Sequence, residues 1–264
     1  LWMLNNKRWG RIGGINGHGY NLTIGKDFLF DEHGYYGLLF DYGSNTVSGA
    51  AGSGEYDSYS LGLYAGNKNK PGSITGFVSY GLQANKGTAY LPVLGQTAES
   101  GYDSKTLGIG VEYAYDLDYG KPEELWHVSP YARLNFTHYR QKAFREHGAG
   151  VFDRSFGSYS DNYAEGELGL SFDRSEGTGG YGIRLGYKRI LAGERQLMEV
   201  CFAEDECGAL LPVRSWGEGR NHFVAAAYVR HDFSRKWSAG GSFSGDWSNG
   251  GREIGARLDL AYHF

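Results

Sequence analysis

The residue types that most often carry chemistry are dispersed along this 264-residue chain. No histidine pair has the i, i+4 spacing of a helical metal site, and no G-x-S-x-G motif occurs. We therefore predict no catalytic site, no metal site and no cofactor. A Ser/His or Asp/His triad stays open as an alternative, because its members meet in space rather than in sequence. The histidines are His18, His33, His127, His138, His147, His222, His231 and His263.

Two cysteines, Cys201 and Cys207, enclose the acidic segment 202–206 (Phe-Ala-Glu-Asp-Glu). If the chain is exported, we expect a disulfide between them, because oxidising compartments favour such bonds. The bond would fix a small acidic loop. We interpret its charges as a solvated surface, with divalent cations or a surface partner as alternative ligands.

Composition favours β-structure and argues against several classes of protein. Gly occurs 43 times and Tyr 21 times, whereas Pro occurs only 5 times. Mean hydropathy is −0.47, and no apolar run is long enough for a transmembrane helix. A membrane-spanning β-strand needs only about ten residues with every second one apolar, so low mean hydropathy is compatible with a β-barrel. A net charge of −4 argues against a nucleic-acid partner.

The last thirteen residues, 252–264, show the clearest organising pattern. From Ile254 onward, even positions are mostly apolar and odd positions are polar or small, and the chain ends on the aromatic Phe264. This period of two predicts a strand with one apolar face. A soluble sandwich could end in such a strand, but a membrane barrel must pair its last strand with its first.

Similar alternation marks about twelve segments, an even number as expected of single-chain bacterial outer-membrane barrels. We therefore predict an all-β fold, a twelve-stranded antiparallel transmembrane β-barrel of the bacterial outer membrane, over residues 9–264. Residues 1–8 are interpreted as the end of a linker or helix from an upstream passenger. We expect loops at about 44–55, 85–103, 141–161 and 192–220.

The polar face of the strands should point into the lumen, and it carries charges of both signs that can pair across the barrel. The expected lumen-facing residues are Arg11, Asp27, Asp41, Glu112, Arg133, Glu165, Glu167, Arg184, Lys188, Glu253, Arg257 and Asp259.

Segment 127–150, the preceding segment 104–117 and the terminal Tyr262-His263-Phe264 together resemble the C-terminal translocator domain of autotransporters. These are the type V secretion proteins of Gram-negative bacteria. The resemblance implies a barrel in the outer membrane that anchors and exports its own N-terminal passenger. It also implies outer-membrane lipid, lipopolysaccharide and the barrel-assembly machinery as partners. The positions that match the family's assembly signal are Gly255, Leu258, Leu260, Tyr262 and Phe264.

Asn5-Asn6 resembles the junction at which some members of the family cut themselves by side-chain cyclisation. Two polar linker residues are the simpler interpretation. Two other functions stay open at this point: a stand-alone channel for small solutes, and a surface adhesin or barrel enzyme that uses the long loops.

Overall fold

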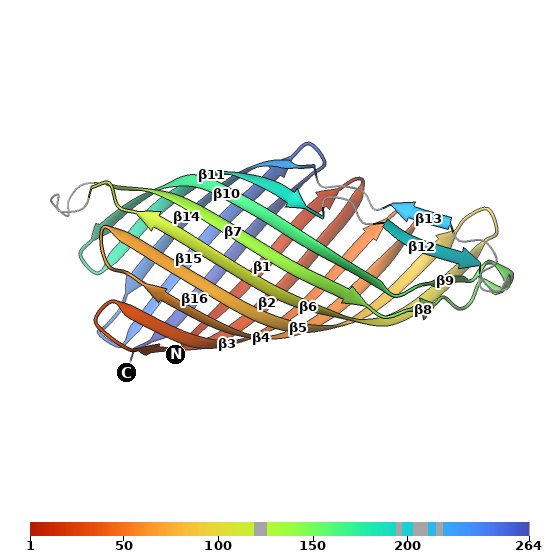
Figure 1. Cartoon of the computed structure of the whole chain (residues 1–264), viewed down its shortest axis with the longest axis horizontal. Coiled ribbons are helices and arrows are strands. Elements are labelled where there is room, and N and C mark those ends of the chain that lie inside the picture. The colour runs from red at the N-terminus through yellow and green to blue at the C-terminus, as the bar shows by residue number, and fades with distance from the viewer. Residues whose placement is uncertain (119–125, 194–196, 203–210, 215–218, 264) are drawn as a thin grey trace.

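Twelve strands form a closed antiparallel barrel in the computed structural model, which describes residues 1–118, 126–193, 197–202, 211–214 and 219–263 (Figure 1). The barrel strands are β1 (Trp2–Ile12), β2 (Ile15–Leu29), β3 (Gly34–Gly49), β4 (Gly52–Asn67), β5 (Gly72–Leu91), β6 (Gln96–Tyr115), β7 (His127–Gln141), β10 (Tyr159–Glu176), β11 (Gly179–Ala192), β14 (Asn221–Asp232), β15 (Trp237–Ser248) and β16 (Gly251–Tyr262). Within the described residues, no helix is long and apolar enough to cross a membrane.

The first and last strands close the cylinder. Strand β1 pairs with β2 on one side and with β16 on the other, in an unbroken register from Trp2 opposite Ala261 to Ile12 opposite Gly251. Closure gives the backbone N–H and C=O groups of both strands hydrogen-bond partners. The hydrocarbon interior of a membrane would offer them none. The predicted twelve-stranded antiparallel barrel is therefore confirmed.

Large apolar side chains lie on the outside of the barrel rather than in a core. Leu258 is 69 % exposed, Leu61 67 % and Leu168 65 %. A water-soluble protein would bury such residues, whereas a barrel in lipid places them against acyl chains. Aromatic pairs flank the apolar band. Tyr42 and Tyr59 lie with ring centroids 5.2 Å apart at one end, and Trp237 and Tyr262 lie 4.9 Å apart at the other.

Strand β1 begins at Trp2, so the assignment of residues 1–8 to a linker or helix is wrong for Trp2 to Arg8. The physical reason is that both neighbouring strands extend far enough to pair with this segment. The pattern concealed it because Asn5 and Lys7 lie on the outer face, where the other strands carry apolar residues.

Two of the expected loops are also strands. Residues 44–55 and 85–103 continue the hairpins β3–β4 and β5–β6, and β5 and β6 are each 20 residues long. These ends reach beyond the apolar band, where a strand needs paired neighbours but no apolar face. The turns of the first three hairpins at this end, β1–β2, β3–β4 and β5–β6, are short. Gly13 and Gly14 connect β1 to β2 with φ of 55° and 88°, values that favour glycine.

At the end with the chain termini, the β2–β3, β4–β5, β10–β11 and β14–β15 turns are also compact. Between β2 and β3, Asp31 Oδ1 accepts hydrogen bonds from the backbone N–H groups of His33 and Gly34. These hydrogen bonds hold the pKa of the Asp31 carboxyl below its usual value, because they stabilise the charged form.

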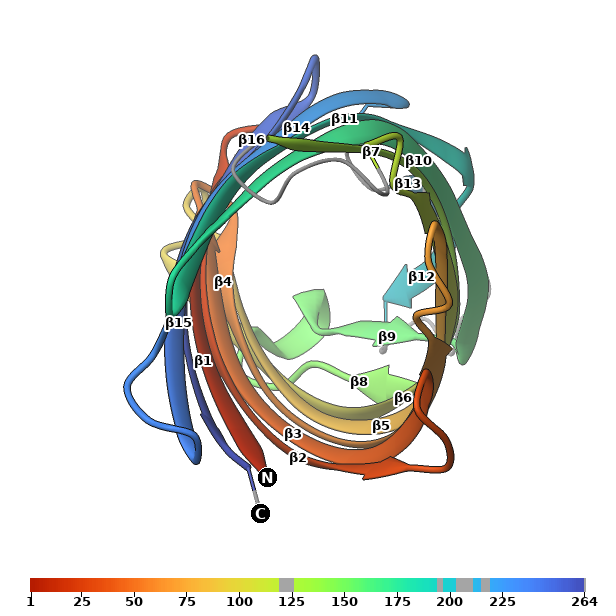
Figure 2. The same ribbon diagram turned by 90° about the vertical axis from the view of Figure 1, so that its left-hand side faces the viewer.

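A small second sheet, unforeseen from the sequence, covers part of the barrel end opposite the termini. It consists of β8 (Phe144–Arg145), β9 (Arg154–Phe156), β12 (Leu197–Phe202) and β13 (Leu211–Arg214), with the short helix η1 (Gly150–Phe152) between β8 and β9. Viewed along the barrel, β8, β9 and β12 lie within the outline of the ring (Figure 2).

Aromatic stacking attaches this sheet to the barrel wall. The Phe144 ring lies between Tyr102 of β6 and Phe156 of β9, with centroids 4.2 and 4.4 Å away. Burial raises the pKa of the Tyr102 hydroxyl, because its charged form would lose solvation. An ion pair between Arg154 and Glu146, 2.7 Å, joins β9 to the segment that follows β8.

Arginine in the middle of the outer band tests the assignment of faces. Val111 lies at the centre of the outward apolar residues of β6. We expect Val111→Arg to lower the free energy of unfolding by about 2–4 kcal/mol, the cost of a cation at the bilayer midplane. The matched control is Thr106→Arg, on the inner face of the same strand, with a much smaller effect. Denaturant titration in lipid vesicles, followed by tryptophan fluorescence, measures both, and equal losses would contradict the assignment.

Candidate functional site

Most of the charged residues of the strands lie on the inner wall of the barrel. The inner face can be assigned from ion pairs between strands that are not neighbours in the sheet. Arg184 on β11 bonds Glu112 on β6 with N···O distances of 2.7 and 3.1 Å, although β10 and β7 lie between these strands. Side chains can span two strands only across the concave face. The register then assigns every other position of each strand to the lumen.

Glu112 is the centre of the largest cluster. It accepts a hydrogen bond from Arg133 Nε at 2.7 Å as well as those from Arg184. Arg133 also lies 3.9 Å from Glu167. The two arginines and two carboxylates join β6, β7, β10 and β11 and leave this part of the wall with balanced charge. Such alternation of signs lets charges remain in a narrow lumen.

Tyr131 completes the cluster because glycines leave space for its ring. In register with Tyr131 on β7 are Gly169 on β10 and Gly186 on β11. A Cβ on Gly169 would come within 2.5 Å of the Tyr131 ring, and one on Gly186 within 2.5 Å of its hydroxyl. The tyrosine therefore lies along the wall, where its hydroxyl donates to Glu167 at 2.7 Å and its ring contacts the Arg184 guanidinium at 3.4 Å.

A second cluster connects β10, β11, β14 and β15. Lys188 forms an ion pair with Asp246 and lies 3.7 Å from Glu165. Asp246 Oδ1 is also 2.6 Å from Nδ1 of the buried His222. The other ring nitrogen of His222 lies 3.0 Å from the carbonyl oxygen of Gly219, so the imidazole links the wall to the segment that enters β14.

A third group lies on the first strands. Asp41 accepts hydrogen bonds from Asn21 Nδ2 at 3.1 Å and from Thr23 Oγ1 at 2.5 Å. Arg8 reaches Asn21 at 3.4 Å and Glu253 on β16 at 3.9 Å. The Arg8–Glu253 contact crosses the seam where β1 meets β16.

Near the termini, Trp2 Nε1 donates to Asp27 at 3.0 Å and lies 2.9 Å from the hydroxyl of Tyr64 on β4. The Tyr64 hydroxyl also donates to Asp27. The indole thus lies across the inner wall beside the start of the chain.

Eleven of the twelve expected lumen residues share the inner face by register, and one does not. Arg11 is on the outer face, opposite Arg252 of β16, because it alternates in step with the outward Trp9, and the inward position beside it is Gly10. The inward residues are Asp27, Asp41, Glu112, Arg133, Glu165, Glu167, Arg184, Lys188, Glu253, Arg257 and Asp259.

The expected set of lumen residues omitted eight inward side chains that take part in these clusters: Trp2, Arg8, Asn21, Thr23, Tyr64, Tyr131, His222 and Asp246. Tyr131, His222 and Asp246 alternate with outward apolar residues, so strict alternation along β7, β14 and β15 would have found them. Trp2 and Arg8 were missed because their segment was not assigned to a strand.

Polar hollows remain between the clusters. One of about 370 Å³ is lined by Arg8, Asn21, Tyr56, Gln83 and Glu253, among others. A second of about 270 Å³ lies against the Lys188–Asp246 cluster. Among the described residues, no group of three or more His, Cys, Asp or Glu side chains is arranged to hold a metal ion.

The candidate cleavage residues lie inside a paired strand. Asn5 is outward and opposite Leu258, and Asn6 is inward and opposite Arg257. Side-chain cyclisation at Asn5 would require backbone that is hydrogen-bonded on both sides to leave the sheet, so the position argues against cleavage. Intact-mass analysis of a longer chain would decide the question.

The other predicted positions fall at the two ends of the barrel. Cys201 on β12 is disulfide-bonded, and Cys207 lies outside the described residues. Leu258, Leu260 and Tyr262 of the terminal strand point outward and Gly255 points inward, whereas Phe264 lies outside the described residues.

A closed barrel with an apolar outer band, aromatic ends and a charged lumen defines an outer-membrane β-barrel protein. The Autotransporter beta-domain model matches residues 2–244. The chain therefore belongs to the Autotransporter beta-domain family and is a translocator barrel of the Gram-negative outer membrane, which in type V secretion exports an N-terminal passenger.

Solved structures of this class have the same fold. The translocator domain of NalP from Neisseria meningitidis is similar with a TM-score of 0.81 at 18% identity, covering 100% of this chain and 87% of that one. The beta domain of Bordetella BrkA gives 0.76 at 15%, covering 100% and 98%. The transport unit of AIDA-I from Escherichia coli gives 0.64 at 12%, covering 100% and 90%. The search of curated proteins found no match.

Removal of Arg184 tests the central cluster. Its side chain and that of Glu112 are each about one quarter exposed, 24 % and 26 %. We expect Arg184→Met to lower the free energy of unfolding by about 1–3 kcal/mol, since Glu112 loses charge-assisted bonds in a confined lumen. The control is Arg257→Met, whose ion pair with Asp259 is longer, 3.8 Å, and half-exposed. If the two variants unfold alike in denaturant, the cluster has no special role.

Proposed function

We propose that this barrel exports its passenger through the lumen and then anchors it at the cell surface. The observation that carries the proposal is a polar lumen in which charges of both signs border unfilled hollows. An extended peptide needs partners for its backbone and polar side chains along the route. The lumen wall can supply donors and acceptors without a strong preference for one charge.

The start of the chain supports this route. The Leu1 amino group donates to the carbonyl oxygen of Tyr262 at 3.0 Å, so both ends of the barrel sequence lie at the same rim. A segment upstream of Leu1 would enter the lumen from this rim, first past Trp2 and then past the Arg8–Glu253 pair. We propose that these inward residues contact the upstream segment.

We further propose an orientation with the termini in the periplasm and the long hairpins outside. The support is that β5, β6 and the small sheet extend from the end opposite the termini (Figure 1). Outer-membrane barrels commonly place short turns inside and long connections outside.

No catalytic role is proposed for the described residues. Asp246 is bonded to His222 and paired with Lys188, so these groups balance charge within the lumen wall. Transport by a wall of fixed charges requires no bond chemistry.

Surface display of an upstream tag tests export through the lumen. We expect an epitope fused ahead of Leu1, behind a secretion signal, to bind antibody on intact cells. Filling the larger hollow with Ser58→Arg and Gln83→Arg should reduce display strongly while the amount of folded barrel stays unchanged, because both side chains line that space. Leu61→Phe, on the outer face of β4, is the control. Undiminished display by the filled barrel would contradict passage through the lumen.

Deletion of Phe264 tests the proposed assembly signal and its recognition by the barrel-assembly machinery. The terminal aromatic follows Tyr262, which packs on Trp237 at the same rim. We expect the deletion to lower the fraction of heat-modifiable barrel in outer-membrane preparations several-fold, while Phe264→Tyr keeps it near the wild-type level. Full assembly without Phe264 would contradict the proposed role.

A further inference from the structure

A hollow of about 380 Å³ lies on the outer face of the barrel, on β4, β5 and β6 next to the end of β7. It is lined by Tyr59, Leu82, Ala84, Asp103, Lys105 and Lys142, with the backbone near Gln83 and Ser104. By register, the side chains from the three strands point away from the lumen. The hollow therefore opens toward whatever surrounds the barrel.

The hollow marks the boundary between the apolar band and the polar extension. Along the hydrogen-bonding direction, Tyr59 faces Leu82, Leu82 faces Lys105, and Lys105 faces Arg140 of β7. The next outward residue of β6 toward the termini is the exposed Leu107, from which the apolar residues continue to Tyr115. An amphiphile at this position would have its polar group against Lys105 and its chains against the apolar band.

Lys105 and Arg140 form a like-charged pair of direct cross-strand neighbours. Like charges directly opposite each other destabilise a sheet. An anion bound between them would remove this repulsion. Both side chains are exposed, and neither forms an ion pair within the described part of the chain. The nearby carboxylate of Asp103 is bound instead by Lys142, at 2.9 Å.

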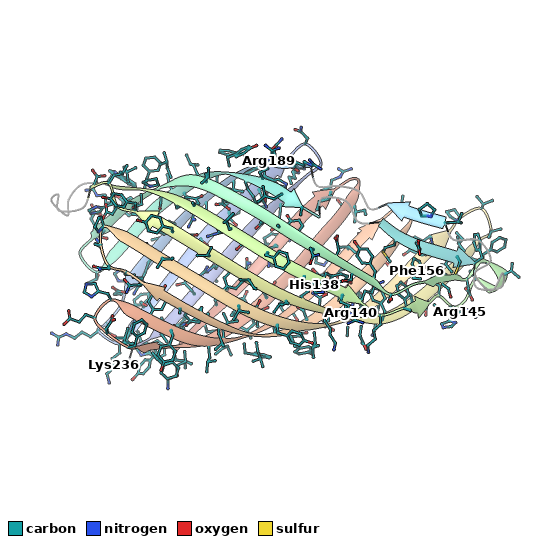
Figure 3. All side chains as sticks on the ribbon, viewed as in Figure 1. His138, Arg140, Arg145, Phe156, Arg189 and Lys236 are labelled. Carbon is teal, nitrogen blue, oxygen red and sulfur yellow. The ribbon has the colours of Figure 1, made fainter. Side chains whose placement is uncertain are left out.

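The neighbouring His138 adds a further polar group on the same face. It points outward two residues before Arg140, and its Nδ1 lies 2.9 Å from Asn162 Oδ1. Figure 3 shows His138 and Arg140 together toward the end of β7 that is remote from the termini. The outer surface thus carries adjacent cations where lipid headgroups would meet the barrel.

We propose that this hollow is a binding site for lipopolysaccharide of the outer leaflet. Lys105 and Arg140 bind a phosphate of its glucosamine disaccharide, Tyr59 packs against the sugar, and the acyl chains lie along Leu82 and Leu107. Phosphate is favoured because the multiple donors of an arginine and the ammonium of a lysine match its several acceptor oxygens. The site depends on the proposed orientation, which directs the hairpin end outward.

Binding of purified lipopolysaccharide by the whole barrel in zwitterionic detergent tests the site. We expect Lys105→Gln with Arg140→Gln to weaken binding at least about tenfold, since two charge-assisted contacts are lost. Lys26→Gln is the matched control. Lys26 is also an outward cation, but it lies at the periplasmic end of the apolar band beside Phe28, 5.2 Å from its ring. Equal affinity of the double variant and the wild type would overturn the proposal.

A second measurement uses only the wild-type barrel and so does not depend on whether the variants fold. Lipopolysaccharide stripped of its glucosamine phosphates should bind the wild-type barrel at least about tenfold more weakly than intact lipopolysaccharide does. Unchanged binding after dephosphorylation would overturn the phosphate contact. Vesicles of phosphatidylglycerol that compete as well as lipopolysaccharide would overturn the choice of ligand.

Failure of the orientation can be recognised separately. A cysteine introduced at Ser53, in the β3–β4 hairpin, should react with a membrane-impermeant thiol reagent on intact cells. Absence of labelling would refute the proposed orientation, and with it a site in the outer leaflet. Labelling together with unaltered lipopolysaccharide affinity in the double variant would refute the site alone.

Discussion

The structure depends on one constraint: every backbone N–H and C=O group at membrane depth must find its partner within the sheet. Closure between β1 and β16 meets this constraint over eleven residue pairs, from Trp2 opposite Ala261 to Ile12 opposite Gly251. An open edge would expose unpaired polar groups to hydrocarbon at a cost of several kcal/mol each. The early start of β1, the outward Asn5 and Lys7, and the proximity of the two termini all follow from closure.

Closure also divides the side chains between two different environments. Outward positions meet lipid and are apolar, whereas inward positions share a narrow space with charges from strands on either side. Some inward glycines make room in that shared space. Gly169 and Gly186 leave a shallow strip along the wall on which the Tyr131 ring lies flat, and this placement brings its hydroxyl to Glu167. The same arrangement occurs where Tyr64 lies over Gly37.

The sequence predicted what period-two alternation encodes and little beyond it. The number of barrel strands, the face on which Glu112 and Arg133 lie, and the closing role of the terminal strand were all accessible from alternation. The extensions of β5 and β6 were not, because strands outside the membrane lose the apolar face that made the others visible. The aromatic stack of Phe144 was not either, since it joins segments that are distant in the chain.

The particular partners within the lumen were equally beyond the sequence. Arg184 and Glu112 are 72 positions apart in the sequence. They meet because the tilt and stagger of the strands, including the intervening β10 and β7, place both residues at the same level along the barrel axis. Alternation predicts the face of the sheet on which a side chain lies, but not its position along the barrel axis. For Arg11 even the expected face was wrong, because its charge favoured the lumen although it alternates in step with the outward Trp9.

The two faces treat charge in opposite ways, and this contrast gives the outer cations their significance. Inside, Glu112 is shared by two arginines and Asp246 by a lysine and a histidine, because removal of water makes an isolated charge expensive. On the outer face, Lys105 and Arg140 lie directly opposite each other, and Asp103 is already engaged by Lys142. At the edge of an apolar band a cation is stabilised when its counter-ion belongs to the surrounding membrane. Inside the barrel the counter-charges come from neighbouring strands. At Lys105 and Arg140 we infer that the counter-charge comes from an anionic headgroup of the membrane.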